Sequence, residues 1–404
     1  MTSSRWWVVA LLFFATTVNY LDRILFSVLI PTIRAEMHLN NQEYGYINGA
    51  FQIAYTVGFL VMGKLIDRFG TKIGYTVAVV WWSLAAILHT TASSAWSLAF
   101  WRSMLGLGES GNFPAAVKAV AEWFPKQQRA LATGCFNAGS NVASMIGPPM
   151  FVWMTALWGW RVCFAVTASL GLVWLVVWWT TYRTPPPPTE VEAPEPTIGW
   201  AAALTYRETW GFGLAKFLTD PVWWFYLYWL PPYFFDVRKF DMKQIAWALP
   251  LVYLMADVGS VGGGWLSGAL IRRGWPNGKA RKFTMGLFAT MMPVAACAAL
   301  VEDRILAVAL VSIATAAHQG WSANLYTTAS DVFPKAATAS VIGIGGCMGG
   351  LGGFLFSAVI PGYVVEHFGY TPVFLTMGAF HLVALVVVHW LLGDMQPVRD
   401  RRVI

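Results

Sequence analysis

The sequence predicts an all-α integral membrane protein with twelve transmembrane helices, arranged as two pseudo-symmetric bundles of six. Three observations predict this fold class: the apolar composition, a series of long uncharged runs, and a pattern that repeats in the two halves of the chain. Of the 404 residues, 57% are hydrophobic and only 12% are charged. A soluble domain typically carries about 25% charged residues, so this composition favours burial in lipid.

The apolar runs approach the roughly 20 residues that a helix needs to cross a bilayer. The stretches from Tyr75 to Ile87 and from Phe283 to Leu300, for example, contain no charged residue. The expected helices span, in chain order, residues 6–34, 44–64, 73–91, 95–118, 130–157, 160–182, 209–235, 244–270, 283–300, 305–329, 338–362 and 370–393.

A segment rich in proline and acidic residues, TYRTPPPPTEVEAPEP, separates the sixth helix from the seventh. Consecutive prolines cannot continue a helix because they lack the backbone N–H, and this composition is typical of a linker. We therefore predict an N-terminal six-helix bundle over 1–182, a cytoplasmic linker over 183–208 and a C-terminal six-helix bundle over 209–404.

The distribution of basic residues predicts the orientation. With both termini and the linker in the cytoplasm, eighteen of the 27 Lys and Arg residues lie on the cytoplasmic side, six on the other side and three within the membrane. Such an excess marks cytoplasmic loops. It also accounts for the net charge of +7 without a nucleic-acid partner. We expect a monomer that crosses a lipid bilayer several times.

The two halves repeat a motif after their fourth helix. EWFPKQQRALATG (122–134) recurs as DVFPKAATASVIG (331–343), an offset of 209 residues. Parallel six-helix repeats with a substrate site near the bilayer midplane are a known plan of secondary transporters. The repeat therefore favours transport as the function.

Ionisable residues within the expected helices are costly in lipid, so each is a functional candidate. Asp22 and Arg23 are adjacent and point about 100° apart on a helix, whereas Arg102 and Glu109 share a face about 10 Å apart. An arginine can bind a carboxylate through two parallel hydrogen bonds. A carboxylate in a poorly solvated cavity can carry a proton. The spacing does not decide which of Asp22 and Arg23 faces the cavity.

The loop between the second and third helices, GKLIDRFGTK (63–72), resembles the loop motif of the major facilitator superfamily. Within that superfamily the chain resembles the anion:cation symporter family, and there the hexuronate transporters, which are related to the galactonate transporters. The resemblance covers nearly the whole chain and rests on YGYINGAFQIAYTVGFLVMGKLIDRFGTKIGY (44–75), AEWFPKQQRALATGCFNAGSNVASMIGPP (121–149), FGLAKFLTDPVWW (212–224) and AHQGWSANLYTTASDVFP (317–334).

The resemblance implies the major facilitator fold and proton-coupled import of glucuronate or galacturonate by alternating access. It assigns proton coupling to Asp22 and Glu109 and binding of the substrate carboxylate to Arg23. It places Tyr20 and Tyr55 near the substrate. In the loop motif it implies a gate latch, in which Asp67 meets a helix N-terminus or a loop arginine; the residues of this gating set are Gly63, Asp67, Arg68, Gly70 and Arg129.

Neutral polar and aromatic side chains in the helices are further candidates for substrate contacts. They are Asn137, Ser140, Asn141, Trp224, His318, Gln319, Asn324 and Tyr326. For Asn137, Ser140 and Asn141 on the fifth helix, the alternative role is hydrogen bonding between helices. Ser140 stands at a position where the galactonate transporters have a glutamine, so the polar contacts there are expected to differ. His318 lies at the repeat equivalent of Glu109, and packing is its alternative role.

Several charged positions stay open. Arg102 is expected to pair with one of the two acids, either to tune it or as a purely structural ion pair, and it is also a candidate substrate contact. Lys216 and Asp220, four residues apart, fit a structural salt bridge. Asp257 has no obvious partner in the sequence.

Other functions are weighed against hexuronate import. The same machinery could carry another sugar acid, such as galactonate or an aldarate, or a small organic anion. A membrane sensor is disfavoured because the chain has no sizeable soluble output domain. An enzyme is not expected, since no nucleophile–base set is visible. No metal site and no cofactor are expected, and the proton gradient across the membrane would supply the energy.

Overall fold

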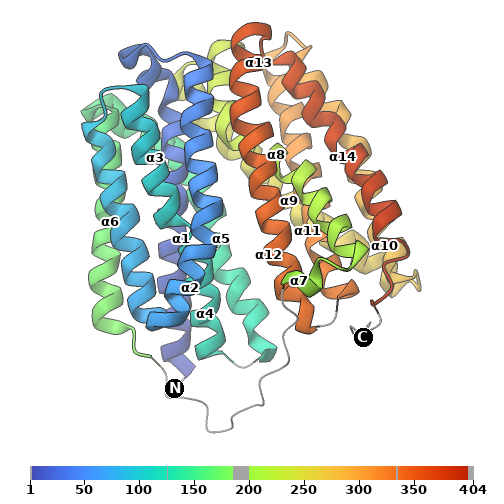
Figure 1. Cartoon of the computed structure of the whole chain (residues 1–404). Helices are drawn as coiled ribbons and strands as arrows, with labels where there is room; N and C mark the ends of the chain where they lie inside the picture. Colours follow the sequence, from blue (N-terminus) through green and yellow to red (C-terminus); the bar gives the residue numbers. More distant parts are fainter. Residues whose placement is uncertain (1, 125, 185–199, 334, 399–404) are drawn as a thin grey trace. The chain divides into compact units, whose positions relative to one another are not determined.

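The computed structural model describes residues 2–124, 126–184, 200–333 and 335–398 of the chain (Figure 1). Within these ranges the regular secondary structure is helical and contains no strand. The predicted fold class is therefore confirmed. The predicted linker, 183–208, lies mostly outside the described residues.

The chain divides into two compact units, which we describe separately. Unit 1 comprises residues 1–190 and 227–250, and unit 2 comprises 191–226 and 251–404. The helices of unit 1 are α1 (Thr2–Met37), α2 (Asn41–Leu88), the 3-10 turn η1 (His89–Thr91), α3 (Ala95–Glu109), α4 (Asn112–Trp123), α5 (Lys126–Trp158) and α6 (Trp160–Thr181), together with the second part of α8 (Arg207–Asp236) and the start of α9 (Met242–Arg272).

Unit 2 contains the rest of α8 and α9 and all later helices. Its further elements are α7 (Trp200–Ala203), α10 (Asn277–Ala296), the 3-10 turn η2 (Cys297–Ala299), α11 (Arg304–Val332), α12 (Lys335–Gly353), the π-helical turn η3 (Phe354–Val359), α13 (Ile360–Phe368) and α14 (Thr371–Leu391). The short helix α7 falls at the end of the predicted linker.

Nine stretches of the described chain are long and apolar enough to cross a membrane. The other three predicted spans are the fourth, fifth and seventh, which correspond to α3 with α4, to α5 and to α8. The fourth span is broken between α3 and α4, the fifth contains an internal pair of prolines (Pro148 and Pro149), and the seventh carries a buried charge. These features lower the apolar character or the continuity of the three spans. The prediction of twelve spans thus matches the order of the helices.

The second and third predicted helices are joined in α2, with a sharp turn at Gly70. This residue has φ 80° and ψ 164°, inside an otherwise helical segment. Residues with a side chain rarely adopt such a positive φ, whereas glycine does so at little cost. Gly70 of the predicted loop motif therefore makes the turn between the two spans.

The fourth predicted helix is broken at Ser110 and Gly111 into α3 and α4. Pro114 has no N–H to offer the carbonyl of Ser110, so the helical hydrogen-bond ladder lacks a bond at this point. At the same break, the side-chain hydroxyl of Ser110 donates a hydrogen bond to the carbonyl of Leu107, at 2.7 Å. The eleventh predicted helix is interrupted in a different way, by the π-helical turn η3 between α12 and α13.

Close packing of α3 on α2 sets the position of the charged residues of α3. A Cβ atom at Gly106 would lie 2.5 Å from the carbonyl oxygen of Phe51 and 3.2 Å from the backbone nitrogen of Tyr55. Only a glycine fits such an approach between two helix backbones. Arg102 and Glu109, one turn to either side of Gly106, are thereby held against α2.

Polar contacts within unit 1 attach the segment 227–250 to α1 and α2. Arg34 of α1 forms an ion pair with Asp236, at 2.9 Å between Nη1 and Oδ2. The Tyr44 hydroxyl donates to the carbonyl of Tyr228 at 2.5 Å, and the Tyr228 hydroxyl donates to Oε1 of Gln52 at 3.0 Å. Unit 1 includes the end of α8 and the start of α9, which the sequence predicts in the C-terminal bundle.

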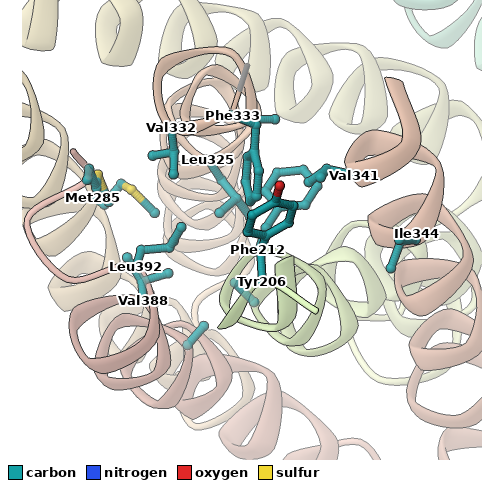
Figure 2. Close-up of a cluster of buried hydrophobic side chains, with 14 of the residues drawn as sticks. Tyr206, Phe212, Met285, Leu325, Val332, Phe333, Val341, Ile344, Val388 and Leu392 are labelled. Carbon is teal, nitrogen blue, oxygen red and sulfur yellow. The ribbon is translucent and has the colours of Figure 1, made fainter. Parts of the chain in front are cut away.

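Unit 2 has a cluster of buried apolar side chains at one end of its helices (Figure 2). Its members come from the start of α8, from α10 to α12 and from α14, and include Tyr206, Phe212, Met285, Leu325, Val332, Phe333, Val341, Ile344, Val388 and Leu392. Phe212 also meets Tyr326 edge-to-face, with ring centroids 6.4 Å apart. The cluster therefore supports one wall of the polar group around Tyr326 described below.

Candidate functional site

Arg23 lies at the centre of a buried polar group in unit 1. Its Nε donates to Oε2 of Glu109 on α3 at 2.9 Å, and the two side chains are 2% and 0% exposed. Its Nη2 donates to Oδ1 of Asn19, one turn earlier on α1, at 3.2 Å. Asn19 in turn donates to the carbonyl of Glu109 at 3.4 Å. The guanidinium thus bridges α1 and α3 through a charge-assisted hydrogen bond.

Two tyrosines enclose the same guanidinium. The Cζ atom of Arg23 lies 4.6 Å from the ring centroid of Tyr20 and 4.5 Å from that of Tyr55. Tyr55 is stacked on Phe51 with centroids 5.8 Å apart. The distances from the Arg23 guanidinium to the two tyrosine rings are within the range in which a cation is attracted to an aromatic face. The structure therefore brings together four predicted residues: Tyr20, Arg23, Tyr55 and Glu109.

Arg102 is fully buried next to this group but does not join its ion pair. Its Cζ lies 4.5 Å from the Phe51 ring and 5.0 Å from the Phe26 ring. Its guanidinium makes long contacts of 3.5 Å with the carbonyl of Arg23 and with Oδ1 of Asn48. Among the described residues, Glu109 forms its ion pair with Arg23 and not with Arg102. Arg102 is close enough to act on the charges of Asp22 and Glu109, and its role in tuning them stays a prediction.

Asp22 points to a different neighbour from Arg23. It is fully buried beside Thr167 of α6. The Thr167 hydroxyl donates to the carbonyls of Cys163 and Phe164. Among the residues that the structure describes, neither carboxylate oxygen of Asp22 has a hydrogen-bond partner. An unpaired buried charge is costly, so the neutral acid is the form that suits this position.

The three candidates on α5 form a small group of their own. Ser140 is buried and donates to the carbonyl of Asn137 at 2.7 Å, and its hydroxyl lies 3.3 Å from Oδ1 of Asn141. Asn137 and Asn141 are exposed. Their roles as substrate contacts stay predictions.

In unit 2, His318 and Asn324 are turned into the packing of the helices. His318 is 3% exposed and stacks on Trp223 with centroids 5.9 Å apart. Its Nδ1 lies 3.2 Å from Nε2 of His381 on α14. The Asn324 amide donates to the carbonyls of Gly263 and Gly320. Packing, the alternative role of His318, fits its contacts, and Asn324 connects α9 and α11 through its hydrogen bond to Gly263.

The remaining candidates of unit 2 lie nearer the surface. Gln319 and Trp224 are half-buried, and Tyr326 is 47% exposed. The Tyr326 hydroxyl accepts a hydrogen bond from Lys216 at 2.7 Å. A groove of about 910 Å³ elsewhere in unit 2, between α10 and α14, is lined by none of the predicted site residues.

The loop motif is only partly described. Gly63 has open space where a Cβ would stand, Gly70 makes the turn, and Arg68 is exposed with its guanidinium 5.5 Å from the Phe69 ring. The side chains of Asp67 and Arg129 lie outside the described residues, so the latch between them stays a prediction.

Sequence reasoning missed Asn19, Asn48 and Glu122. Asn19 could have been found as a polar residue one helical turn from Arg23 in an apolar run. Glu122 begins the repeated motif, and it accepts hydrogen bonds from Thr71 at 2.6 Å and Tyr182 at 2.9 Å. Asp331, its equivalent 209 residues later, pairs with Arg281 at 3.2 Å. In both units this acid ties neighbouring helices together.

A helical membrane protein with a repeated half and buried ionisable residues at mid-helix has the plan of a secondary transporter. The sequence pattern of the Major Facilitator Superfamily matches residues 12–357. The chain belongs to this superfamily.

Several curated relatives cover most of the chain. The hexuronate transporter of Escherichia coli strain K12 is 31% identical over 412 residues, covering 97% of this chain and 95% of that protein. The galacturonate transporter of Dickeya chrysanthemi is 31% identical over 280 residues, covering 65% and 81%. The D-galactonate transporter of Escherichia coli O6:H1 is 25% identical over 418 residues, covering 98% and 97%.

Solved structures support the fold. A bacterial homologue of the human lysosomal transporter Spinster matches with a TM-score of 0.73 and 18% sequence identity, covering 98% of this chain and 97% of that one. At this identity the likeness shows the fold alone. The family is one of transporters, in agreement with the expectation that the chain is not an enzyme.

Proposed function

We propose that the protein imports hexuronates, such as glucuronate and galacturonate, together with protons. The observation that carries this proposal is the buried Arg23–Glu109 pair between two tyrosine rings, in a chain 31% identical to a hexuronate transporter. A guanidinium matches the geometry of a sugar carboxylate, and aromatic faces suit the apolar surfaces of a sugar ring.

The geometry suggests how protons and substrate are coupled. When Glu109 is ionised, it occupies the guanidinium of Arg23 at 2.9 Å. Protonation of Glu109 removes its charge, and Arg23 becomes available to the substrate carboxylate. Removing the anionic partner of a buried ion pair is destabilising, so a substrate carboxylate that replaces the ionised Glu109 would keep Arg23 paired. Proton binding and substrate binding therefore favour one another.

Asp22 is proposed as a second proton carrier. It is buried without a hydrogen-bond partner among the described residues, where the neutral acid is favoured. It lies on the face of α1 that meets α6, so its proton would not compete directly with the substrate. Arg102, fully buried nearby, would add positive charge to the surroundings of both acids.

Alternating access would expose this site to each side of the membrane in turn, as in other transporters built from two repeats. We place the protein in the bacterial inner membrane, as a monomer with both termini in the cytoplasm. No cofactor takes part, and the proton gradient drives accumulation.

Another sugar acid is the second candidate substrate. It is favoured by the relatives of 25% to 28% identity, which include a D-galactonate transporter and a probable galactarate/D-glucarate transporter. The same carboxylate–arginine contact would serve these compounds.

Uptake into proteoliposomes tests the proposal. Labelled glucuronate is offered with an acidic exterior or at equal pH, and a panel of unlabelled galacturonate, galactonate, galactarate and glucose competes. We expect accumulation only with the pH gradient and the strongest competition by galacturonate. Stronger competition by galactonate or galactarate than by galacturonate would assign the second candidate, and a lack of any uptake would contradict both.

A further inference from the structure

A groove of about 910 Å³ lies within unit 2, between the start of α10 and the end of α14, which are neighbours in the bundle (Figure 1). Its volume is within the range of small-molecule sites, about 300–1,000 Å³. α10 begins at Asn277 and α14 ends at Leu391, and both helices belong to stretches that are long and apolar enough to cross a membrane. The groove therefore opens at one surface of the bilayer, where these two spans end.

The lining of this groove changes from polar to apolar along the two helices. Lys279 and Asp394 line its outer end, in the first turn of α10 and just after α14. Leu385 and Val386 line it one to two turns inside the end of α14, and Phe283 lines it nearly two turns inside the start of α10. A phospholipid has its charged and apolar parts in the same order, whereas a soluble anion would use the outer end alone.

Aromatic side chains place the outer end of the groove at the level of the lipid headgroups. Trp275, just before α10, meets Phe283 edge-to-face with ring centroids 5.4 Å apart. Trp390, in the last turn of α14, also lines the groove and is 73% exposed. Tryptophan is enriched at membrane–water interfaces because its ring is apolar and its N–H is polar. The headgroup of a lipid is therefore the group that meets this end of the groove.

Two lysines supply positive charge to the groove. Lys279 and Lys282 are three residues apart on α10, so they lie on one face of the helix. The Lys279 ammonium lies 5.0 Å from the centroid of the Trp275 ring. Lys282 is half-buried, and its long stem can extend the ammonium toward the membrane surface. One phosphate group can therefore meet both lysines.

The two groove lysines differ in their partners from other basic residues of unit 2. Arg207, Lys216 and Arg281 each form an ion pair with a nearby acid. Among the residues that the structure describes, Lys279 and Lys282 form no such pair. Their ammonium groups are therefore available to a bound anion.

Asp394 limits the kind of anion that fits. It is near enough to act on the charge of Lys282, and with His389 neutral the groove keeps one net positive charge. That charge matches the single negative charge of a phosphodiester. A carboxylate only accepts hydrogen bonds, so Asp394 suits the hydroxyl groups of a glycerol headgroup. A zwitterionic lipid such as phosphatidylethanolamine has no net charge to match that of the groove.

We propose that this groove binds an anionic phospholipid with a glycerol headgroup, such as phosphatidylglycerol. Its phosphate lies between Lys279 and Lys282, and its headgroup hydroxyls donate to Asp394. One acyl chain follows the apolar part of the groove along Phe283 and Leu385. Basic pockets between transmembrane helices are suited to anionic headgroups in this way. The site uses neither Arg23 nor Glu109, so it does not depend on which substrate the protein carries.

Native mass spectrometry of the full-length protein in detergent tests the proposal. Phosphatidylglycerol or phosphatidylethanolamine with the same acyl chains is titrated, and the fraction of protein with one bound lipid is measured. We expect wild type to bind phosphatidylglycerol about tenfold more tightly. Lys279→Gln/Lys282→Gln should raise the apparent Kd for phosphatidylglycerol about tenfold and leave that for phosphatidylethanolamine unchanged, because each basic residue near the headgroup contributes to the attraction.

Arg272→Gln/Arg273→Gln is the matched control. These two arginines are exposed near the start of α10 but do not line the groove, and their loss removes the same amount of charge. The control should bind phosphatidylglycerol as wild type does. Equal weakening in the two double variants would mean general attraction to a basic surface and would overturn the site. So would equal affinity of wild type for the two lipids, or displacement of the lipid by free glycerol phosphate at the same concentration.

Discussion

Arg23 is the residue on which the account depends most. It is buried, and the partners that surround it come from three helices: Glu109 of α3, Asn19 and Tyr20 of α1, and Tyr55 of α2. Removing one partner of a buried ion pair is strongly destabilising, whereas exchanging it for another anion is not. This difference is the physical basis for exchange between Glu109 and a substrate carboxylate.

A Glu109→Gln variant tests the role of this acid. Glutamine has nearly the same shape and can still accept a hydrogen bond from Arg23, but it cannot gain or lose a proton. We expect the variant to lose uphill accumulation of glucuronate driven by a pH gradient while it retains counterflow at equal pH. Accumulation at the wild-type level would show that another group couples the proton.

The residue scale also marks the limit of prediction from the sequence. Helical geometry predicted that Asp22 and Arg23 point to different neighbours, and the structure places them beside α6 and α3 respectively. The partner of Arg102 could not be predicted, because it depends on how α1, α2 and α3 pack. For the same reason the contact of His318 with His381, 63 residues away, has no signal in the sequence.

At the scale of elements, glycines decide how closely the helices approach. Gly106 lets α3 lie against the backbone of α2, and this contact fixes the height at which Glu109 meets Arg23. The sequence predicted twelve spans and the turn at the loop motif, because hydrophobic length and glycine content are local signals. It did not predict the π-helical turn η3, which interrupts a continuous apolar segment.

A Gly106→Ala substitution should destabilise the protein. Its new Cβ would lie 2.5 Å from the carbonyl oxygen of Phe51, so α3 must move away from α2. Overpacking of this kind costs about 1–3 kcal/mol, and we expect a lower apparent Tm in detergent. Gly346→Ala is the control, because a Cβ there meets no atom within 4 Å. Equal Tm values for the two variants would contradict the proposed packing.

At the scale of the whole molecule, the repeat predicted from the sequence has a structural counterpart in each unit. Glu122 and Asp331, 209 residues apart, each connect neighbouring helices through polar contacts. The predicted boundaries of the bundles stay a prediction, because unit 1 also includes residues 227–250. Those residues belong to α8 and α9 by sequence but make polar contacts with α1 and α2, which no local pattern reveals.

The excess of basic residues predicts the orientation of the chain. We expect a green fluorescent protein fused to the C-terminus to fluoresce in bacterial cells, because it folds in the cytoplasm. Alkaline phosphatase fused at the same place should be inactive. An active phosphatase together with a dark fluorescent protein would place the C-terminus outside and reverse the proposed orientation.

The central claim is that a hexuronate and protons cross the membrane together. The most direct measurement is the pH of a weakly buffered suspension of proteoliposomes after glucuronate is added outside, with the membrane potential held at zero. The account predicts that the external pH rises as protons enter with the substrate, and that liposomes carrying Glu109→Gln show no rise. Entry of glucuronate into wild-type liposomes without any change in external pH would contradict it.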